Sequence, residues 1–178
     1  MKLNIFSIPL YIANIDINKI NLVNEKFEET WLSETSSSHN FKNTLDNNSI
    51  NYLLQKIGSL LSEDIKGKFK INLTSIWQNN YKENDFQERH THAGSHFSFI
   101  IFKKIDESRT VFLNPIEDLI TSYYNGSNLN IFEQVYTPEC RQGQIILFPS
   151  FLGHMVKKTS NASTIAGNIT LEILNGNN

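Results

Sequence analysis

Residues 86–102, FQERHTHAGSHFSFIIF, place three of the chain's five histidines directly before a run of apolar, β-branched and aromatic residues. His90 and His92 are two positions apart, and residues so spaced on a β-strand point to the same face of the sheet. Both imidazoles can therefore converge on one point. The segment from His96 to Lys103, HFSFIIFK, is typical of a buried strand. The stretch thus predicts a metal-bearing strand, a turn and a core strand.

A metal site needs a further ligand, and His154 is the candidate because of the segment that contains it. This segment, GQIILFPSFLGHMV at residues 143–156, comprises a turn glycine, a buried strand, a proline that ends the strand, and the histidine. The other interpretation of the H-x-H pattern is a polar turn that binds no metal. Of the remaining histidines, His96 is expected to be an outer neighbour of the site or exposed, and His39 to be solvated.

The bulk composition fits a single globular domain spanning residues 1–178. A net charge of −2 and 19% charged residues give no basic excess, so nucleic acid and anionic membranes are not expected partners. The single cysteine, Cys140, excludes an internal disulfide and fits a reducing compartment. The apolar opening segment is interrupted by Pro9 and Asn14 and predicts a strand rather than a signal peptide or membrane helix. We therefore expect a soluble, cytoplasmic protein.

The first of two predicted helices follows Asp16, a residue type that caps helix N-termini. Its apolar positions recur every three or four residues, as on one face of a helix: Ile20, Val23, Phe27 and Trp31. Residues 33–48 show no such periodicity and predict a polar loop.

The second predicted helix starts at a Ser49 cap, carries apolar residues from Ile50 to Ile65 on one face, and stops at Gly67. Everything after it reads as short strands and turns, apart from a long excursion at residues 114–130 that suits a lid or a dimer contact. This order predicts an α+β, mainly β fold, a sandwich or jelly-roll barrel with two N-terminal helices packed on it.

The motifs together resemble those of a known family. W-x-N, H-x-H, an apolar strand with a serine, and then G-x-x-x-x-F-P-S-x-x-x-H-x-V resemble the prolyl-hydroxylase-like branch of the 2-oxoglutarate/Fe(II)-dependent oxygenases. The matching residues are Trp77, Asn79, His90, His92, Ser98, Gly143, Phe148, Pro149, Ser150, His154 and Val156. The resemblance implies a double-stranded β-helix, the jelly roll also found in cupins, with Fe(II) and 2-oxoglutarate bound in it. It also implies hydroxylation of an unactivated C–H bond with release of CO2 and succinate.

This sequence departs from the family pattern at two places. His92 stands where the family has an aspartate, so a bound iron would meet three neutral imidazoles and keep more positive charge. The family also places an arginine or lysine on the strand after the distal histidine, where this chain has Ser163 and Thr164. Losing one partner of a desolvated charge pair costs about 2–5 kcal/mol. The bases available to replace it are Lys103, Lys104, Arg109, Arg141, Lys157 and Lys158.

The leading hypothesis is an Fe(II)- and 2-oxoglutarate-dependent hydroxylase. Its predicted metal ligands are His90, His92 and His154, and its predicted co-substrate contacts are Asn79, Ser98, Thr164 and Asn168. The substrate would be a small molecule or an amino-acid side chain, free or in a protein. One alternative keeps the fold but not 2-oxoglutarate, as a three-histidine dioxygenase or a cupin-like protein that holds iron or zinc. Another is an inactive homologue that serves as a binding or structural module, as a homodimer for example.

Overall fold

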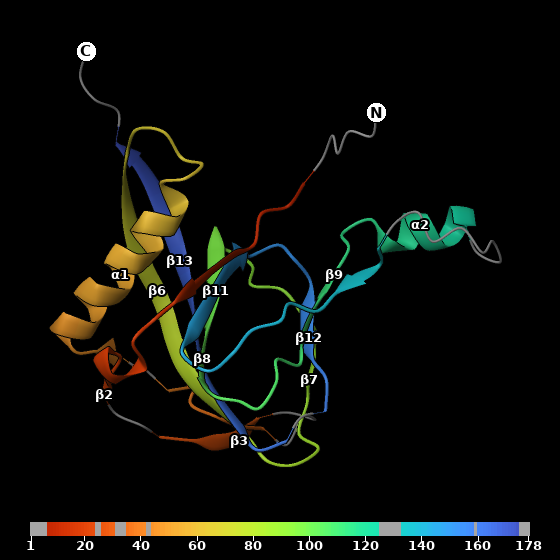
Figure 1. Ribbon diagram of the computed structural model, residues 1–178, viewed down its shortest axis with the longest axis horizontal. Helices are drawn as coiled ribbons and strands as arrows, with labels where there is room; N and C mark the ends of the chain where they lie inside the picture. Colours follow the sequence, from red (N-terminus) through yellow and green to blue (C-terminus); the bar gives the residue numbers. More distant parts are fainter. Residues whose placement is uncertain are drawn as a thin grey trace.

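Two antiparallel sheets enclose the interior of the protein in the computed structural model (Figure 1). The structure describes residues 7–23, 26–30, 35–41, 44–124, 133–158 and 160–174. Within these ranges the larger sheet has, in spatial order, β1 (Tyr11–Asn14), β11 (Gln144–Pro149), β8 (Phe97–Lys104), β13 (Ala162–Leu174), β6 (Lys68–Tyr81), β4 (Thr35–Ser37) and β3 (Glu28–Thr30). The smaller sheet has β10 (Val135–Tyr136), β9 (Thr110–Leu113), β12 (His154–Val156) and β7 (Gln87–His90). A two-stranded sheet joins β2 (Leu22–Val23) to β5 (Thr44–Leu45).

The chain passes back and forth between the two main sheets as it runs from β6 to β13. Strands β6, β8, β11 and β13 belong to the larger sheet, whereas β7, β9, β10 and β12 belong to the smaller one. All of these pairings are antiparallel. This alternation is the strand arrangement of a jelly roll. The mainly β fold predicted from the strand-rich second half of the sequence is therefore confirmed.

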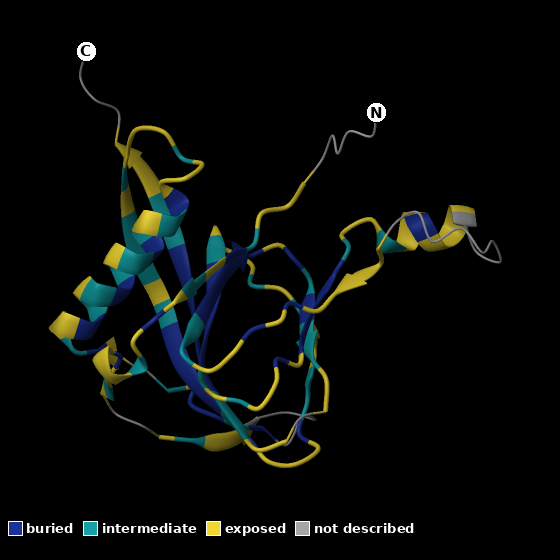
Figure 2. Ribbon diagram, viewed as in Figure 1, coloured by how far each residue is buried: buried dark blue, intermediate teal, exposed yellow. Residues whose placement is uncertain are grey.

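The central strands of the larger sheet are buried on both faces. On β8, Phe99 and Ile101 pack with helix α1 (Asn47–Leu61), whereas Ile100 and Phe102 pack inside the barrel. Strand β11 alternates in the same way. Burial on both faces explains why these two segments read as continuous apolar runs. Figure 2 shows the buried residues concentrated along these strands.

Helix α1 corresponds to the second predicted helix, but it ends at Leu61, before the predicted stop at Gly67. Its N-cap is Asp46 and not Ser49, because the Asp46 carboxylate accepts hydrogen bonds from the backbone N–H groups of Asn48 and Ser49, each at 2.9 Å. The Ser49 hydroxyl instead donates to the same carboxylate. The helix lies across the larger sheet (Figure 1). It buries one face there completely, through Leu53, Ile57 and Leu61.

The first predicted helix is wrong, so one N-terminal α-helix, instead of two, packs on the barrel within the described ranges. Asp16 does cap a helical turn, since its carboxylate accepts from the N–H of Asn18 at 3.1 Å, but that turn is a 3₁₀ helix over Ile17–Lys19. The chain then forms β2 and β3. Leu22 of β2 pairs with Leu45 of β5, so cross-strand pairing outweighs the helical periodicity of a segment rich in β-branched residues. Trp31 lies outside the described residues.

Two short strands, β4 and β5, lie within residues 33–48, so the prediction of a loop without regular structure is also wrong. Strand β4 joins the larger sheet beside β6. Ser37 of β4 is buried, and its hydroxyl donates to Oδ1 of Asn79 at 2.6 Å. The polar segment enters the sheet because its side chains find partners there. Residues 33–34 and 42–43 lie outside the described ranges.

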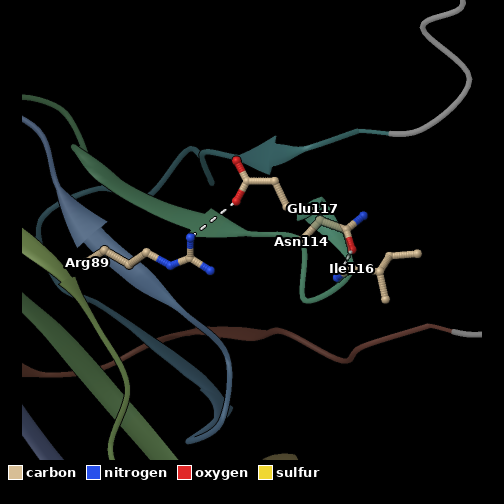
Figure 3. Close-up of polar contacts among 4 residues, drawn as sticks. All are labelled: Arg89, Asn114, Ile116 and Glu117. Carbon is tan, nitrogen blue, oxygen red and sulfur yellow. Dashed lines mark hydrogen bonds and ion pairs between the residues drawn. The ribbon is translucent and has the colours of Figure 1, made fainter. Parts of the chain in front are cut away.

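A second helix, α2 (Glu117–Tyr124), lies within the excursion at residues 114–130, of which 125–130 are not described. Asn114 begins the turn into it by accepting the N–H of Ile116 at 3.1 Å. Glu117 forms an ion pair with Arg89 of β7 at 3.5 Å (Figure 3). This contact connects the excursion to the strand that carries His90. In the described ranges neither helix is long and apolar enough to cross a membrane.

Candidate metal centre

The structure brings the three predicted metal ligands together. His90 is the last residue of β7 and His154 the first of β12, and the two are direct partners in the antiparallel pairing of these strands. His92 follows two residues after β7 has ended. One ring nitrogen from each histidine lies within 4.8 Å of the other two. Small side-chain movements can therefore bring all three within the about 2.0–2.1 Å of a typical metal–imidazole bond.

Backbone carbonyl groups orient two of the three rings. Nδ1 of His90 lies 2.7 Å from the carbonyl oxygen of Glu88, and Nδ1 of His154 lies 3.0 Å from that of Leu152. A carbonyl oxygen only accepts, so Nδ1 carries the proton in both rings and Nε2 keeps its lone pair. A hydrogen bond of this kind is the usual way to fix the tautomer of a metal-binding histidine.

Burial keeps these imidazoles neutral at neutral pH. Burial first, and then the neighbouring His90, lowers the pKa of His154 to about 3 and that of His92 to about 4. Burial also lowers the pKa of His90. Neutral imidazole is the form that binds a metal ion. The donor set thus fits a transition metal such as Fe(II), with coordination positions left for other ligands.

The histidines line a cavity between the two main sheets. Alternate residues of β6 and β13 point into it, as expected for strands that form its wall. They are Trp77, Asn79 and Tyr81 of β6 and Ala162, Thr164 and Ala166 of β13. The cavity therefore combines a metal-binding wall on the smaller sheet with a mixed polar and apolar wall on the larger one.

The four predicted co-substrate contacts fall into two groups. Asn79 and Thr164 line the cavity, and both are buried. Ser98 and Asn168 are buried too, but neither is among the described residues that line it. The Ser98 hydroxyl donates a hydrogen bond to Oδ1 of Asn168 at 2.7 Å, so each of these two side chains has a hydrogen-bond partner within the protein.

Arg109 is the one cationic side chain among the described residues that line the cavity. It precedes β9 and forms an ion pair with Glu107, which lines the cavity as well. Between them, Ser108 is buried, and its hydroxyl has no hydrogen-bond partner in the described part of the chain. Of the other bases considered, Lys103 donates to Oε1 of Gln78 at 3.1 Å. The remaining ones, which also do not line the cavity, are Lys104, Arg141, Lys157 and Lys158.

Tyr81 and Ser108 are among the cavity-lining residues that the sequence analysis did not single out. Tyr81 continues the alternation of Trp77 and Asn79 on β6 and was detectable by the same two-residue spacing. Burial raises the pKa of Tyr81, so its hydroxyl keeps its proton, which it donates to Oε1 of Gln87 at 3.2 Å. Ser108 lies in an irregular segment, where no periodicity indicates which side chain turns inward.

The remaining histidines do not join the metal cluster. His96 holds the start of β8 to β13, because its N–H donates to the carbonyl of Ile169 and its Nδ1 accepts the N–H of Leu171. His39 is exposed, as expected for a solvated residue, yet its ring meets the edge of Trp77 at 4.7 Å between centroids. Trp77 also contacts His92, at 5.6 Å between ring centroids.

Comparison with known proteins agrees with this geometry. Residues 75–165, more than half of the chain, match the model of a family described as "Putative 2OG-Fe(II) oxygenase", where 2OG is 2-oxoglutarate. The matched range contains His90, His92 and His154. No curated protein sequence matches the chain.

Several solved structures share the fold. An oxidoreductase of the 2OG-Fe(II) oxygenase family from Burkholderia pseudomallei superposes with a TM-score of 0.55 at 12% identity, over 83% of this chain and 73% of that one. A prolyl hydroxylase from Trichoplax adhaerens, solved with a peptide fragment of hypoxia inducible factor, superposes with a TM-score of 0.53 at 16% identity, over 81% of this chain and 70% of that one. HygX from Streptomyces hygroscopicus, solved with nickel and 2-oxoglutarate, superposes with a TM-score of 0.54 at 8% identity, over 92% of this chain and 83% of that one.

The structural likeness at such low identity concerns the fold, whereas the family model concerns the sequence itself and includes all three histidines. The jelly roll, the histidine cluster and the family match agree with one another. The chain belongs to the family of Fe(II)- and 2-oxoglutarate-dependent oxygenases.

Proposed function

We propose that the chain binds Fe(II) through His90, His92 and His154, binds 2-oxoglutarate beside it, and hydroxylates an unactivated C–H bond. The substrate is a small molecule or an amino-acid side chain, free or in a protein. The observation that carries this proposal is the convergence of three neutral imidazoles in a cavity that also presents Arg109 and an unpartnered hydroxyl. Iron, when bound, supplies the activation of oxygen that no protein side chain provides.

The charge of the site favours an anionic co-substrate. Three neutral imidazoles leave the full positive charge of Fe(II) uncompensated, unlike a site that includes a carboxylate ligand. A 2-oxo acid brings one carboxylate to the metal end of the cavity. The second carboxylate of 2-oxoglutarate then requires a cation at the other end, and Arg109 is the described cavity residue that provides one.

Ser108 and Arg109 together suit that second carboxylate. A buried hydroxyl without an acceptor costs about 1–3 kcal/mol, a cost that a bound carboxylate removes. The guanidinium group of Arg109 offers a planar pair of donors for the same anion. Its present partner, Glu107, is easily replaced, because their side chains are 42% and 64% exposed and exposed ion pairs contribute only about 0–1 kcal/mol.

Polar residues of the larger sheet complete the proposed co-substrate site. Asn79, Tyr81 and Thr164 line the same cavity, and the side chains of Asn79 and Thr164 both interact with the Tyr81 hydroxyl. Thr164 stands on the strand where the family has its base. We propose that these groups orient the bound acid by hydrogen bonds, while Arg109 supplies the charge from the opposite sheet.

An anaerobic titration tests the proposal. Apo-protein receives Fe(II) and then 2-oxoglutarate, and the metal-to-ligand charge-transfer absorbance is recorded at each step. We expect a new band after the second addition, and we expect His154→Ala to lose both iron binding and the band. His96→Ala, which lies outside the cluster, is the matched control and keeps both. Iron binding without a band would instead favour a three-histidine dioxygenase that does not use 2-oxoglutarate.

A further inference from the structure

His92 is held by different means from the other two histidines of the cluster. His90 and His154 lie on paired strands, and each ring bonds to a carbonyl group. His92 lies beyond the end of β7, and its ring makes no hydrogen bond to the described part of the chain. Its one backbone anchor is the N–H group, which donates to the carbonyl oxygen of Ser150 at 3.0 Å.

Ser150 holds both ends of the turn that carries His92. Besides accepting from His92, it donates its own N–H to the carbonyl of His96 at 3.0 Å. Between these two contacts the chain reverses at Gly94, whose φ of +81° is readily adopted only by glycine. The turn from His92 to His96 is thus fastened at both ends to one fully buried residue.

Ser150 is itself held by a series of buried side chains. The Ser98 hydroxyl donates its proton to Asn168 at 2.7 Å, so it accepts from the hydroxyl of Ser150 at 2.8 Å. Nδ2 of Asn168 in turn donates to the hydroxyl of Ser75 at 2.9 Å. These residues belong to β8, β13 and β6, three neighbouring strands of the larger sheet. The series therefore connects the rigid sheet to the turn that bears His92.

We infer that Ser150, supported by Ser98 and Asn168, is a positioning residue that holds His92 at the metal. Ser98 and Asn168, predicted from the sequence to contact the co-substrate, act here through the backbone of a metal ligand. The inference rests on the metal site of the proposed function. A ligand without a ring hydrogen bond or a strand pairing needs such support, because every side-chain or backbone rotation it retains must be lost when the metal binds.

Metal affinity measured on the full chain tests this role. Apo-protein is titrated with Co(II) alone, read by its visible absorbance, for the wild type and Ser150→Ala. Ser150→Ala keeps the backbone hydrogen bonds to His92 and His96 and removes only the hydroxyl that anchors them to Ser98. We therefore expect an affinity weaker by at most about tenfold, the lower end of the about 10–100-fold typical when a direct partner of a metal ligand is removed. Ser49→Ala is the matched control, since Ser49 is equally buried and hydrogen-bonded but lies at the start of α1. It is expected to lower the melting temperature and leave Co(II) affinity unchanged.

A double-mutant cycle separates positioning from general stability. Ser150→Ala should weaken Co(II) binding in a His90→Ala background, where His92 remains, and have no effect in a His92→Ala background. An equal loss in both backgrounds, or no loss in the wild type, overturns the inference. If His92→Ala itself leaves the affinity unchanged, the three-histidine site of the proposed function fails instead. Should Ser150→Ala not fold, Ser98→Ala enters the same cycle, with the same pattern expected at a smaller size.

Discussion

The two ends of the cavity are built on opposite principles. At the metal end, three imidazoles are largely buried and kept neutral, and backbone groups fix two of the rings. At the other end, Arg109 and Glu107 form an exposed ion pair in an irregular segment. Metal coordination demands fixed directions, so paired strands set His90 and His154, and the turn after β7 sets His92, before the ion arrives. In the proposed function this end recognises a carboxylate, and Arg109 can exchange its exposed partner Glu107 for that ligand at little cost.

The largest effect should come from removing the cation of the carboxylate end. Arg109→Gln is expected to weaken 2-oxoglutarate binding to the iron-loaded protein about 10–100-fold, the range for a lost hydrogen bond to a charged group. Iron affinity should not change, because the histidines are untouched. Titration of the charge-transfer band with 2-oxoglutarate measures the first quantity, and a separate Fe(II) titration without 2-oxoglutarate measures the second.

Lys104→Gln is the matched control for that variant, since Lys104 is an exposed cation that does not line the cavity. It should leave 2-oxoglutarate affinity within about twofold, as expected for an exposed charge away from the ligand. Equal losses in the two variants would mean that net charge alone attracts the acid, and the contrast between the two ends would disappear.

The dependence of the free energy of unfolding on pH tests whether the folded chain keeps His154 neutral at the metal end. The pKa of His154 is about 3 in the folded chain, against about 6.5 for an unperturbed histidine. Below pH 6.5 the unfolded chain therefore takes up a proton that the folded chain does not. The free energy of unfolding of the apo-protein should fall with decreasing pH, by up to about 1.4 kcal/mol per pH unit from this residue until the pH approaches the folded pKa.

Urea unfolding of the wild type and His154→Gln between pH 7 and pH 4 isolates this contribution. Carboxyl groups contribute equally to both proteins, so the difference between the slopes belongs to His154. A saturating metal ion should protect the wild type and not the variant at pH 7. Parallel slopes would show that the imidazole is not kept neutral by the fold.

The smallest effect should come from removing the ion-pair partner of Arg109. Glu107→Gln removes its present partner, and we expect 2-oxoglutarate affinity to rise by at most about threefold, since exposed ion pairs are weak. The gain should shrink as the salt concentration rises. Glu139→Gln, at an exposed position outside the cavity, should produce no gain. A loss of affinity in Glu107→Gln would mean that Glu107 helps to hold the acid.

Those parts of the molecule that depend on local pattern could be predicted from the sequence. The buried strands β8 and β11 read as apolar runs, and α1 shows a clear helical period. The metal cluster was detectable because H-x-H and a histidine after a strand are both local signals. The direct pairing of His90 with His154 is then a consequence of jelly-roll topology.

What could not be predicted depends on contacts between distant segments. The helical spacing after Asp16 was overridden by the pairing of β2 with β5, which no pattern near residue 20 reveals. Of the six bases considered, Arg109 lines the cavity because of how the segment between β8 and β9 turns toward it. Ser98 and Asn168 were predicted to contact the co-substrate, but neither lines the cavity, and their hydrogen-bond partners belong to distant segments.

The pairing of β7 with β12 has a further consequence for the behaviour of the chain as a polymer. His90 and His154 lie in separate parts of the sequence, with β8 to β11 between them. An ion that joins them closes a long loop, and it does so reversibly, like a disulfide that forms without oxidation. Closure of a long loop removes many conformations from the unfolded chain. A bound metal would therefore act as a removable cross-link between β7 and β12 for as long as the ion is present.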